Sequence, residues 1–433
     1  MKELKILIGR HYHFGFEHNT SLTINSILPI LQKKFNVKII WFFYLPEKVN
    51  FLTHDKNEKI IDIHDFNNAL EVIDKINPDL IFDSEYPSVM DLSLDFAAKF
   101  RNIPVVTKMI SSDKERISMM QFLTSFFPMF FHNSMPFEKG EKKFMKRGRF
   151  FLFKYRFFLK TLLKINFNIL KILKYLLITL KWHIRYETPY IDSRLANTLH
   201  FLENESLKQK MIKSGFREEN LIVTGNPIYD KIFKKDQGKI YKNIQGKRKI
   251  LFAPIQLYEG GIWTKKQRDV TIRLIVKKIL EHKKEFKLII KIHPTSQSLE
   301  EYKKLVHKID ESIEIYQDGI LEDYLDGVDT VLSFGTVYGS LIPTLITQKK
   351  LIICNFINYK PITPIDKRVA IECKDVNSLI QIIQRKRNLE EEKEKINSYL
   401  NEIMYRPDGM ASERVACALS ELILAGKNYK NRQ

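Results

Sequence analysis

Residues 287–297 read KLIIKIHPTSQ, and residues 330–346 read TVLSFGTVYGSLIPTLI. In each stretch a short apolar run stops at a turn signal, which is typical of buried parallel strands. The first run ends at His293 and Pro294, and the second ends at the small-residue turn 333–336. Ligands of open α/β sheets bind outside the carboxyl ends of the strands, and backbone N–H groups at a strand-to-helix turn attract anions. We therefore predict two neighbouring strand ends that hold a diphosphate. The alternative is a capped helix beside a structural histidine.

The same alternation of strand and helix runs through most of the chain. Apolar runs typical of strands occur at 4–8, 37–43, 80–82, 105–106, 197–202, 221–224, 249–253, 288–292 and 351–354. Periodic segments between them predict helices, for example at 205–213, 270–282, 340–347 and 388–403. This order is typical of a parallel, doubly wound α/β sheet. A length of 433 residues favours two to three such domains.

The net charge of +20 is concentrated in one segment. Residues 139–186 contain fourteen Lys or Arg and one acid, Glu141, so this segment alone carries +13. The cysteines Cys354, Cys373 and Cys417 lack metal-ligand spacing, and we expect reduced thiols in a cytosolic protein. The N-terminal MKELKILIGR has a strand pattern, so we expect no signal peptide there.

Residues 149–185 contain no proline or glycine, which predicts one long helix. At about 100° per residue, an arc of about 100° gathers the basic side chains Arg156, Lys160, Lys164, Lys171, Lys174, Lys181 and Arg185. The remaining surface of the helix is apolar, and Leu162, Leu173 and Leu176 belong to it. The sequence therefore predicts a helix with one basic stripe and one broad leucine face.

This segment does not have the composition of a membrane span. A span needs ~20 largely uncharged residues, whereas the uncharged runs between the lysines reach six. We predict instead that the helix lies in the interface of an anionic membrane, where each basic residue adds ~1 kcal/mol. The alternative is a helix that packs on its own domain. Nucleic acid is disfavoured as a partner because polar base-reading side chains are missing from the segment.

Five short motifs follow one another between residues 223 and 415. They are VTGNPIYDKI (223–232), ILFAPIQ (250–256), KIHP (291–294), SFGTVYGS (333–340) and DGMASERV (408–415). Together they resemble the GT-B glycosyltransferases and the related UDP-GlcNAc 2-epimerases. The nearest likeness is to bacterial capsule and surface-polysaccharide transferases, including CDP-glycerol glycerophosphotransferases. The resemblance implies an α/β fold of two Rossmann-like domains facing a cleft, with an inserted basic amphipathic helical segment.

The expected domain boundaries combine these motifs with the composition. The N-terminal, acceptor-binding domain would comprise residues 1–138 and 187–233, interrupted by the membrane-interface insertion 139–186. A charged linker, 234–248, would lead into the donor-nucleotide domain, 249–405. Residues 406–433 would form a turn and a helix, for which a return to the N-terminal domain stays open.

The resemblance also implies a binding role for the stretch that opens the second domain's site. His293 would contact the donor phosphate. Backbone and hydroxyl donors at the helix N-terminus would come from Ser333, Gly335, Thr336 and Ser340. Fixed donors of this kind stabilise the negative charge that develops on a departing nucleotide.

Two further features bear on the donor. The loop 256–264 would close over it, with Gln256, Gly260 and Gly261 in the loop and the glycines permitting the turn. Many relatives carry an acid after the glycine turn that binds the ribose, whereas this chain reads SLIPTLI at 340–346. CMP- and CDP-linked donors therefore stay open beside UDP-sugars. Glu322 and Asp323 are candidate replacements for the acid, or caps of the next helix.

An inverting transfer needs a carboxylate or histidine that takes the proton from the acceptor hydroxyl. Such residues follow the first and third strands of the first domain, and we favour Glu17 or Glu85, with His13 as a further candidate. His18 and Asp83 lie in the same two strand-end regions. The sequence offers no paired acids for a metal, so we expect neither metal nor cofactor, the nucleotide-activated donor being a substrate.

These observations predict a cytoplasmic glycosyltransferase held peripherally on the inner face of the cell membrane. It would move a sugar from a nucleotide-linked donor to a surface-polysaccharide or lipid-linked acceptor, which docking on the membrane would concentrate. Three alternatives remain: a CDP-glycerol-type polyol-phosphate transferase, a nucleotide-sugar 2-epimerase, and a non-catalytic, membrane-bound glycan-binding protein.

Overall fold

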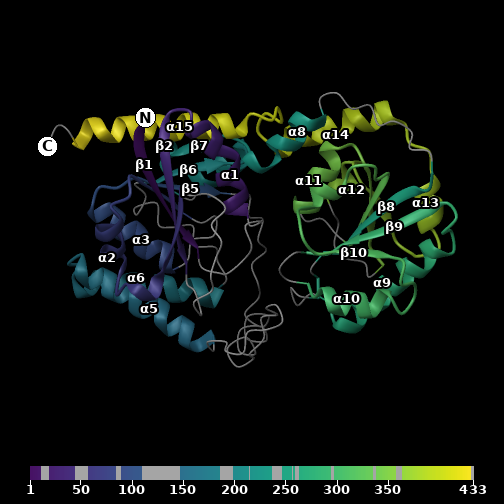
Figure 1. The fold of residues 1–433 in the computed structure, drawn as a ribbon, viewed down its shortest axis with the longest axis horizontal. Helices are drawn as coiled ribbons and strands as arrows, with labels where there is room; N and C mark the ends of the chain where they lie inside the picture. The colour runs from purple at the N-terminus through teal and green to yellow at the C-terminus, as the bar shows by residue number, and fades with distance from the viewer. Residues whose placement is uncertain are drawn as a thin grey trace. The chain divides into compact units, whose positions relative to one another are not determined.

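The apolar runs of the sequence form the strands of two separate parallel sheets (Figure 1). The computed structural model describes residues 1–10, 19–43, 57–83, 89–109, 147–185, 198–213, 215–236, 246–255, 257–258, 263–293, 297–334, 338–356 and 363–430. Unit 1 comprises Met1–Ile228 together with Met410–Gln433, and unit 2 comprises Tyr229–Gly409. Each unit therefore has its own sheet and its own core.

Unit 1 is built on a seven-stranded sheet with the order β3-β2-β1-β4-β5-β6-β7. The strands are β1 (Lys2–Arg10), β2 (Phe35–Phe43), β3 (Glu58–Asp62), β4 (Leu80–Asp83), β5 (Val105–Met109), β6 (Thr198–Leu202) and β7 (Leu221–Val223). In the central strand β1, Leu7 is fully buried and pairs with Ile40 of β2 and Ile81 of β4. The strand order reverses between β1 and β4, as in doubly wound folds.

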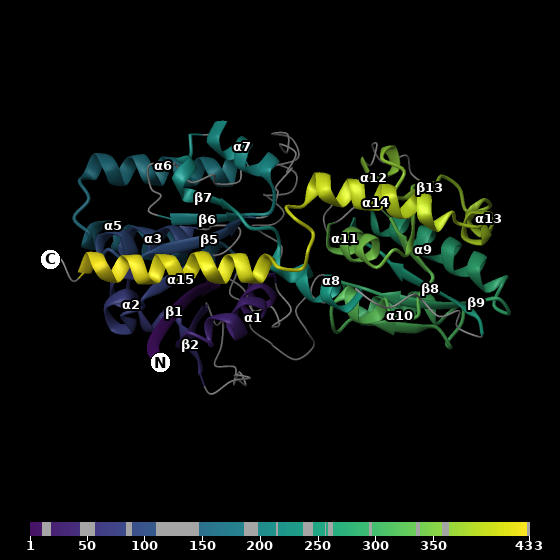
Figure 2. The same cartoon turned by 90° about the horizontal axis from the view of Figure 1, so that it is seen from above.

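Helices cover both faces of this sheet (Figures 1 and 2). One face carries α1 (Asn19–Leu31) and the C-terminal α15 (Ala411–Lys430), which bury Ile27 and Leu419 in one apolar cluster with the strands. The opposite face carries α2 (Ala69–Ile76) and α3 (Val89–Phe100). A smaller apolar cluster joins α7 (Glu205–Lys213) to β6 and β7. The sheet and these helices thus form three layers of an α/β domain.

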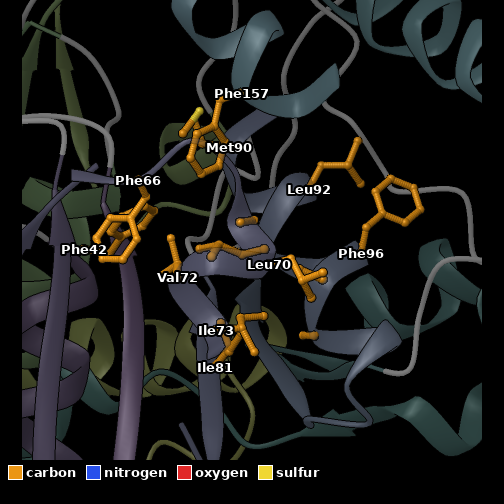
Figure 3. Packing of buried hydrophobic residues seen from close by; sticks show 14 of the residues in the cluster. Phe42, Phe66, Leu70, Val72, Ile73, Ile81, Met90, Leu92, Phe96 and Phe157 are labelled. Carbon is orange, nitrogen blue, oxygen red and sulfur yellow. The ribbon is translucent and has the colours of Figure 1, made fainter. Parts of the chain in front are cut away.

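The basic segment forms a further layer on α2 and α3, as two helices, α5 (Arg147–Lys164) and α6 (Ile169–Arg185). Phe157 and Phe158 of α5 are buried in the same apolar cluster as these two helices. Figure 3 shows Phe157 next to Met90 of α3. The Thr161 hydroxyl also accepts a 2.9 Å hydrogen bond from the backbone N–H of Ala69, at the start of α2. One face of α5 is therefore part of the core of unit 1.

The single helix predicted for residues 149–185 is wrong. Asn166 adopts a left-handed backbone with φ of 58°, which ends α5, and asparagine tolerates this conformation better than most residues. Asn168 then accepts the backbone N–H of Lys171 at 2.8 Å and caps α6. The exposed apolar surface of this segment is also narrower than the predicted leucine face, because Leu162 is fully buried in unit 1.

Unit 2 contains a six-stranded parallel sheet with the order β10-β9-β8-β11-β12-β13. The strands are β8 (Arg248–Ala253), β9 (Phe286–Lys291), β10 (Glu314–Tyr316), β11 (Thr330–Ser333), β12 (Lys350–Cys354) and β13 (Ile371–Cys373). The helices are α8 (Asp230–Asp236), α9 (Lys265–Leu280), α10 (Leu299–Val306), α11 (Tyr338–Ile346), α12 (Thr363–Asp366), α13 (Leu379–Gln384) and α14 (Leu389–Ile403). The order again reverses, here between β8 and β11.

Two details of unit 2 concern the sequence predictions. Cys354 and Cys373, two of the three cysteines expected as reduced thiols, are free and buried at paired positions of β12 and β13. The segment predicted as a linker, 234–248, starts inside α8 and ends at the first residue of β8, and its residues 237–245 lie outside the described part of the chain.

Candidate functional site

The strand-order reversal of unit 2 lies between β8 and β11, and this is where open α/β sheets bind ligands. Phe252 of β8 pairs with Ile290 of β9 on one side and with Leu332 of β11 on the other. The carboxyl ends of the three strands therefore lie level with one another. Our prediction that β9 and β11 are neighbours is wrong, because β8 runs between them, at about 4.8 Å from each.

His293 follows β9 at this end of the sheet and is exposed, so that a ligand can reach it. Its backbone N–H donates a 2.7 Å hydrogen bond to Oε1 of Gln297. Local packing around the imidazole and the positive charge of Lys291 lower the pKa of His293. The ring is therefore neutral at pH 7 and presents one N–H donor, until an anion beside it favours protonation.

Gln297 is the buried residue that organises the loop after β9. Besides accepting from His293, its Nε2 donates to the carbonyl of Pro254, just after β8, at 3.2 Å, and to the Tyr302 hydroxyl at 2.8 Å. The backbone carbonyl of Gln297 accepts a 2.7 Å hydrogen bond from Nε2 of Gln317, just after β10. One side chain and its carbonyl thus tie together the ends of three strands. Sequence reasoning did not single out Gln297, because its partners are distant in the chain.

Lys291 supplies a fixed positive charge beneath the same loop. The side chain is buried, and its ammonium group donates to the carbonyls of Ile292 at 2.9 Å and Gln317 at 2.8 Å. It also lies 5.6 Å from the ring centre of Tyr324. Carbonyl groups and an aromatic ring hold this positive charge in place, where it can act on a nearby anion.

The turn after β11 is only partly described, since Gly335 and Thr336 lie outside the described residues. On its strand side, Ser333 is fully buried, and its hydroxyl has no hydrogen-bond partner among the described residues. Phe334 is buried against Phe252 and Trp263, with ring centres 5.1 and 4.9 Å away. On its helix side, α11 begins at Tyr338 and places Ser340 in its first turn.

Of the two acids considered as replacements for the ribose ligand, Asp323 is a cap. Its carboxylate accepts the backbone N–H of Ile320 at 3.2 Å, at the start of the short helix Leu321–Tyr324. Glu322 is half-buried, and burial raises its pKa to about 7, which Lys291 opposes. The carboxyl group of Glu322 therefore changes its charge close to pH 7.

The candidate bases of unit 1 are mostly untested by the structure. Glu17, Glu85, His13 and His18 lie outside the described residues, as do Gln256, Gly260 and Gly261 of the donor loop. Asp83 is described, ends β4 and is buried.

A second buried acid, Asp91 in the first turn of α3, lies at the end of β1. A methyl group on Gly9 would come within 2.8 Å of the Asp91 carboxylate, so only glycine permits this contact. Among the described residues, no group of three or more His, Cys, Asp or Glu side chains is placed to hold a metal ion.

The fold has clear relatives of known structure, although no family model and no curated protein matches the sequence. A putative UDP-N-acetylglucosamine 2-epimerase from Listeria monocytogenes is 13% identical with a TM-score of 0.53, over 97% of this chain and 96% of that one. The UDP-GlcNAc 2-epimerase from Methanocaldococcus jannaschii is 15% identical at 0.53, over 97% and 99%. A variant of the wall teichoic acid polymerase TagF is 10% identical at 0.56, over 98% and 90%. The chain has a GT-B fold.

In this GT-B chain, two of the five motifs meet inside unit 1. Nε of Arg414, from the motif 408–415, donates a 2.7 Å hydrogen bond to the carbonyl of Thr224, from the motif 223–232. Asn226 in turn donates to the buried Glu203 at 3.2 Å. These contacts hold the start of α15 beside the end of β7. Both motifs therefore have a structural role in the GT-B fold, whereas the motifs of β8, β9 and β11 surround the candidate site.

Proposed function

We propose that this GT-B protein is an enzyme that binds the phosphates of a nucleotide-linked donor at the ends of β8, β9 and β11. The observation that carries the proposal is the pairing of an exposed, neutral His293 with the buried ammonium group of Lys291 on one preorganised loop. The N-terminus of α11 adds the positive end of its dipole on the other side. His293, Ser333, Gly335, Thr336 and Ser340 are the proposed donor-phosphate ligands, under a loop containing Gln256, Gly260 and Gly261.

We further propose group transfer as the reaction. The donor would lose its nucleotide, and the negative charge that develops on the departing phosphate would be stabilised by His293 and the field of Lys291. The acceptor would be a surface polysaccharide or a lipid-linked glycan at the cytoplasmic face of the membrane. Its hydroxyl proton would go to a base of unit 1, for which Glu17, Glu85 and His13 remain the candidates. No cofactor and no nucleic acid takes part.

A polyol-phosphate transfer from a CDP-linked donor is the second candidate. It is supported by the lack of an acid in 340–346 and by the structural likeness to TagF, a wall teichoic acid polymerase. Nucleotide-sugar 2-epimerisation has the support of the epimerase structures. A non-catalytic glycan-binding protein would need none of the phosphate ligands.

One experiment separates these candidates. The purified full chain is incubated with radiolabelled CDP-glycerol and with UDP-, CMP- and GDP-sugars, with and without a membrane extract as acceptor. Acceptor-dependent incorporation from a sugar nucleotide supports the glycosyltransferase. Incorporation from CDP-glycerol alone supports the second candidate, and conversion of a free UDP-sugar without acceptor supports the epimerase. No turnover of any donor would contradict the enzymatic proposal.

A further inference from the structure

The exposed apolar side chains of the described residues gather on α5 and α6. Fourteen large hydrophobic residues are strongly exposed, and seven of them belong to these two helices, at exposures from 37% to 77%. They are Leu152, Leu159, Leu163, Ile169, Leu170, Leu173 and Leu177, here called the leucine surface. Apolar exposure of this density is uncommon outside binding surfaces.

Helical geometry places these residues in one arc of each helix. At about 100° per residue, Leu152, Leu159 and Leu163 fall within about 40° of one another on α5. On α6, the four residues of the leucine surface fall within about 100°. These arcs are separate from the buried faces, which carry Phe158 on α5 and Ile172 on α6. Both helices therefore pack on unit 1 with one side and leave an apolar stripe on another.

A basic stripe lies next to the apolar stripe on each helix. On α5 it contains Arg156 and Lys160, and on α6 it contains Lys174 and Lys171, in each case on the same rotational side of the leucines. Lys160 also donates a 3.0 Å hydrogen bond to Asn67 of unit 1. Residues 147–185 contain no Asp or Glu, so no acid within these helices neutralises the basic residues.

We propose that the leucine surface docks on an anionic lipid bilayer. The leucines would enter the boundary between headgroups and acyl chains, while Arg156, Lys171 and Lys174 contact lipid phosphates. A second copy of the chain is a poor occupant, because two such surfaces would bring like charges together without any acid between them. The bilayer supplies both the apolar layer and the negative charge that the surface lacks. Among the described residues no helix is long and apolar enough to cross it.

This inference rests on the proposed function, because membrane docking would bring the enzyme to a lipid-linked acceptor. Lipid binding itself requires neither donor nor turnover. The leucine surface differs from the apolar face of the predicted single helix. Leu162 and Ile172 are buried inside unit 1, and the residues of the leucine surface are exposed. The basic stripe then supports the docking, and the leucines provide its salt-resistant part.

The test is sedimentation of the full chain with vesicles of phosphatidylglycerol and phosphatidylcholine, and with vesicles of phosphatidylcholine alone. The leucine variant carries Leu163→Gln, Leu173→Gln and Leu177→Gln. The charge variant carries Arg156→Glu, Lys171→Glu and Lys174→Glu. The control carries Val270→Gln and Leu274→Gln, which replace exposed apolar residues of α9 in unit 2. Circular dichroism verifies that each variant is folded, as expected for substitutions of exposed side chains.

The parent and the control should bind the anionic vesicles equally. The affinity of the leucine variant for these vesicles should be at least about tenfold weaker. The charge variant should lose binding at low salt, and the parent should keep part of its binding at high salt. Equal sedimentation of parent and leucine variant would overturn the proposal. The proposal would also be overturned if the leucine variant binds lipid as the parent does but is a monomer in analytical ultracentrifugation where the parent is a dimer. Donor binding, measured separately by thermal shift, distinguishes failure of the docking surface from failure of the proposed enzyme function.

Discussion

The backbone N–H of His293 donates its hydrogen bond to Gln297, 2.7 Å away, and this contact fixes the proposed phosphate ligand to the ends of β8 and β10. The side chain of Gln297 has two further partners and its backbone carbonyl has a third, so the position of His293 depends on the ends of β8 and β10 as well. An anion that meets this loop encounters donors that are already in place, so binding requires little reorganisation.

Replacement of Gln297 by leucine should therefore weaken both the fold and donor binding. The substitution removes the hydrogen bonds that Gln297 makes with the His293 N–H, the Pro254 carbonyl and the Tyr302 hydroxyl, at a cost of about 1–3 kcal/mol for buried groups. Urea unfolding and nucleotide titration measure the two effects. The control is Gln384→Leu, which removes one exposed hydrogen bond to Glu285. Equal nucleotide affinity of Gln297→Leu and the parent would show that the loop does not position His293.

Glu322 should make unit 2 less stable as the pH rises. Burial raises its pKa to about 7 from an ordinary 4.5, so between these values the folded state binds the proton that the unfolded state has released. Stability should then fall from pH 5 to pH 8, by roughly 3 kcal/mol at most. Glu322→Gln should flatten this dependence, and the exposed Glu311→Gln should leave it unchanged. A profile of Glu322→Gln identical to the parent's would contradict the account.

His200 should have the opposite effect in unit 1. Its ring is buried in β6 and has no hydrogen-bond partner among the described residues, and burial lowers its pKa to about 4. Below an unfolded pKa of about 6.5, the unfolded chain takes up a proton that the folded chain cannot, so stability falls from pH 6.5 to 4 by roughly 3 kcal/mol. His200→Leu should remove this part of the acid sensitivity, as measured by unfolding at several pH values. Persistence of the full acid sensitivity would assign it to other groups.

Gly409 should not tolerate alanine. Its φ of 74° is left-handed, and a methyl group there would lie 3.0 Å from Cβ of Phe233 and 3.3 Å from the Asp230 carbonyl. We expect Gly409→Ala to destabilise the protein by about 1–3 kcal/mol in thermal unfolding. Gly246→Ala is the matched control, since φ is 136° but no atom lies within 4 Å of the added methyl group. A smaller loss for Gly409→Ala than for Gly246→Ala would contradict the steric explanation.

The interior strands and the edge strand β7 were predictable from the sequence, and the other edge strands were not. Strands such as β4 and β12 are buried on both faces and read as continuous apolar runs. The edge strands β3, β10 and β13 are short and half-exposed, and the polar residues in them give no apolar run. The break between α5 and α6 was missed because Asn166 is a weaker signal than proline or glycine, although asparagine accepts the left-handed backbone.

The candidate site was predictable only where a residue stands at the end of an apolar run. His293 could be found in this way, because the strand pattern stops just before it. The roles of Gln297 and Tyr302 arise from contacts among loops that are far apart in the sequence, up to Pro254 and Gln317. The separation of α5 and α6 into a buried face, a leucine stripe and a basic stripe likewise depends on what each helix packs against, which periodicity alone does not reveal.

The most direct test of the central claim is nucleotide binding to the parent and to His293→Ala. Thermal shifts are measured with CMP, CDP, UDP and GDP, since a ligand bound only by the folded form raises its stability. His282→Ala is the control, because His282 precedes β9 at the opposite end of the same strand. We predict that at least one nucleotide stabilises the parent and His282→Ala. The affinity of His293→Ala for that nucleotide should be at least about tenfold weaker. Equal stabilisation of all three proteins, or of none, would contradict the claim that these strand ends hold the phosphates of the donor.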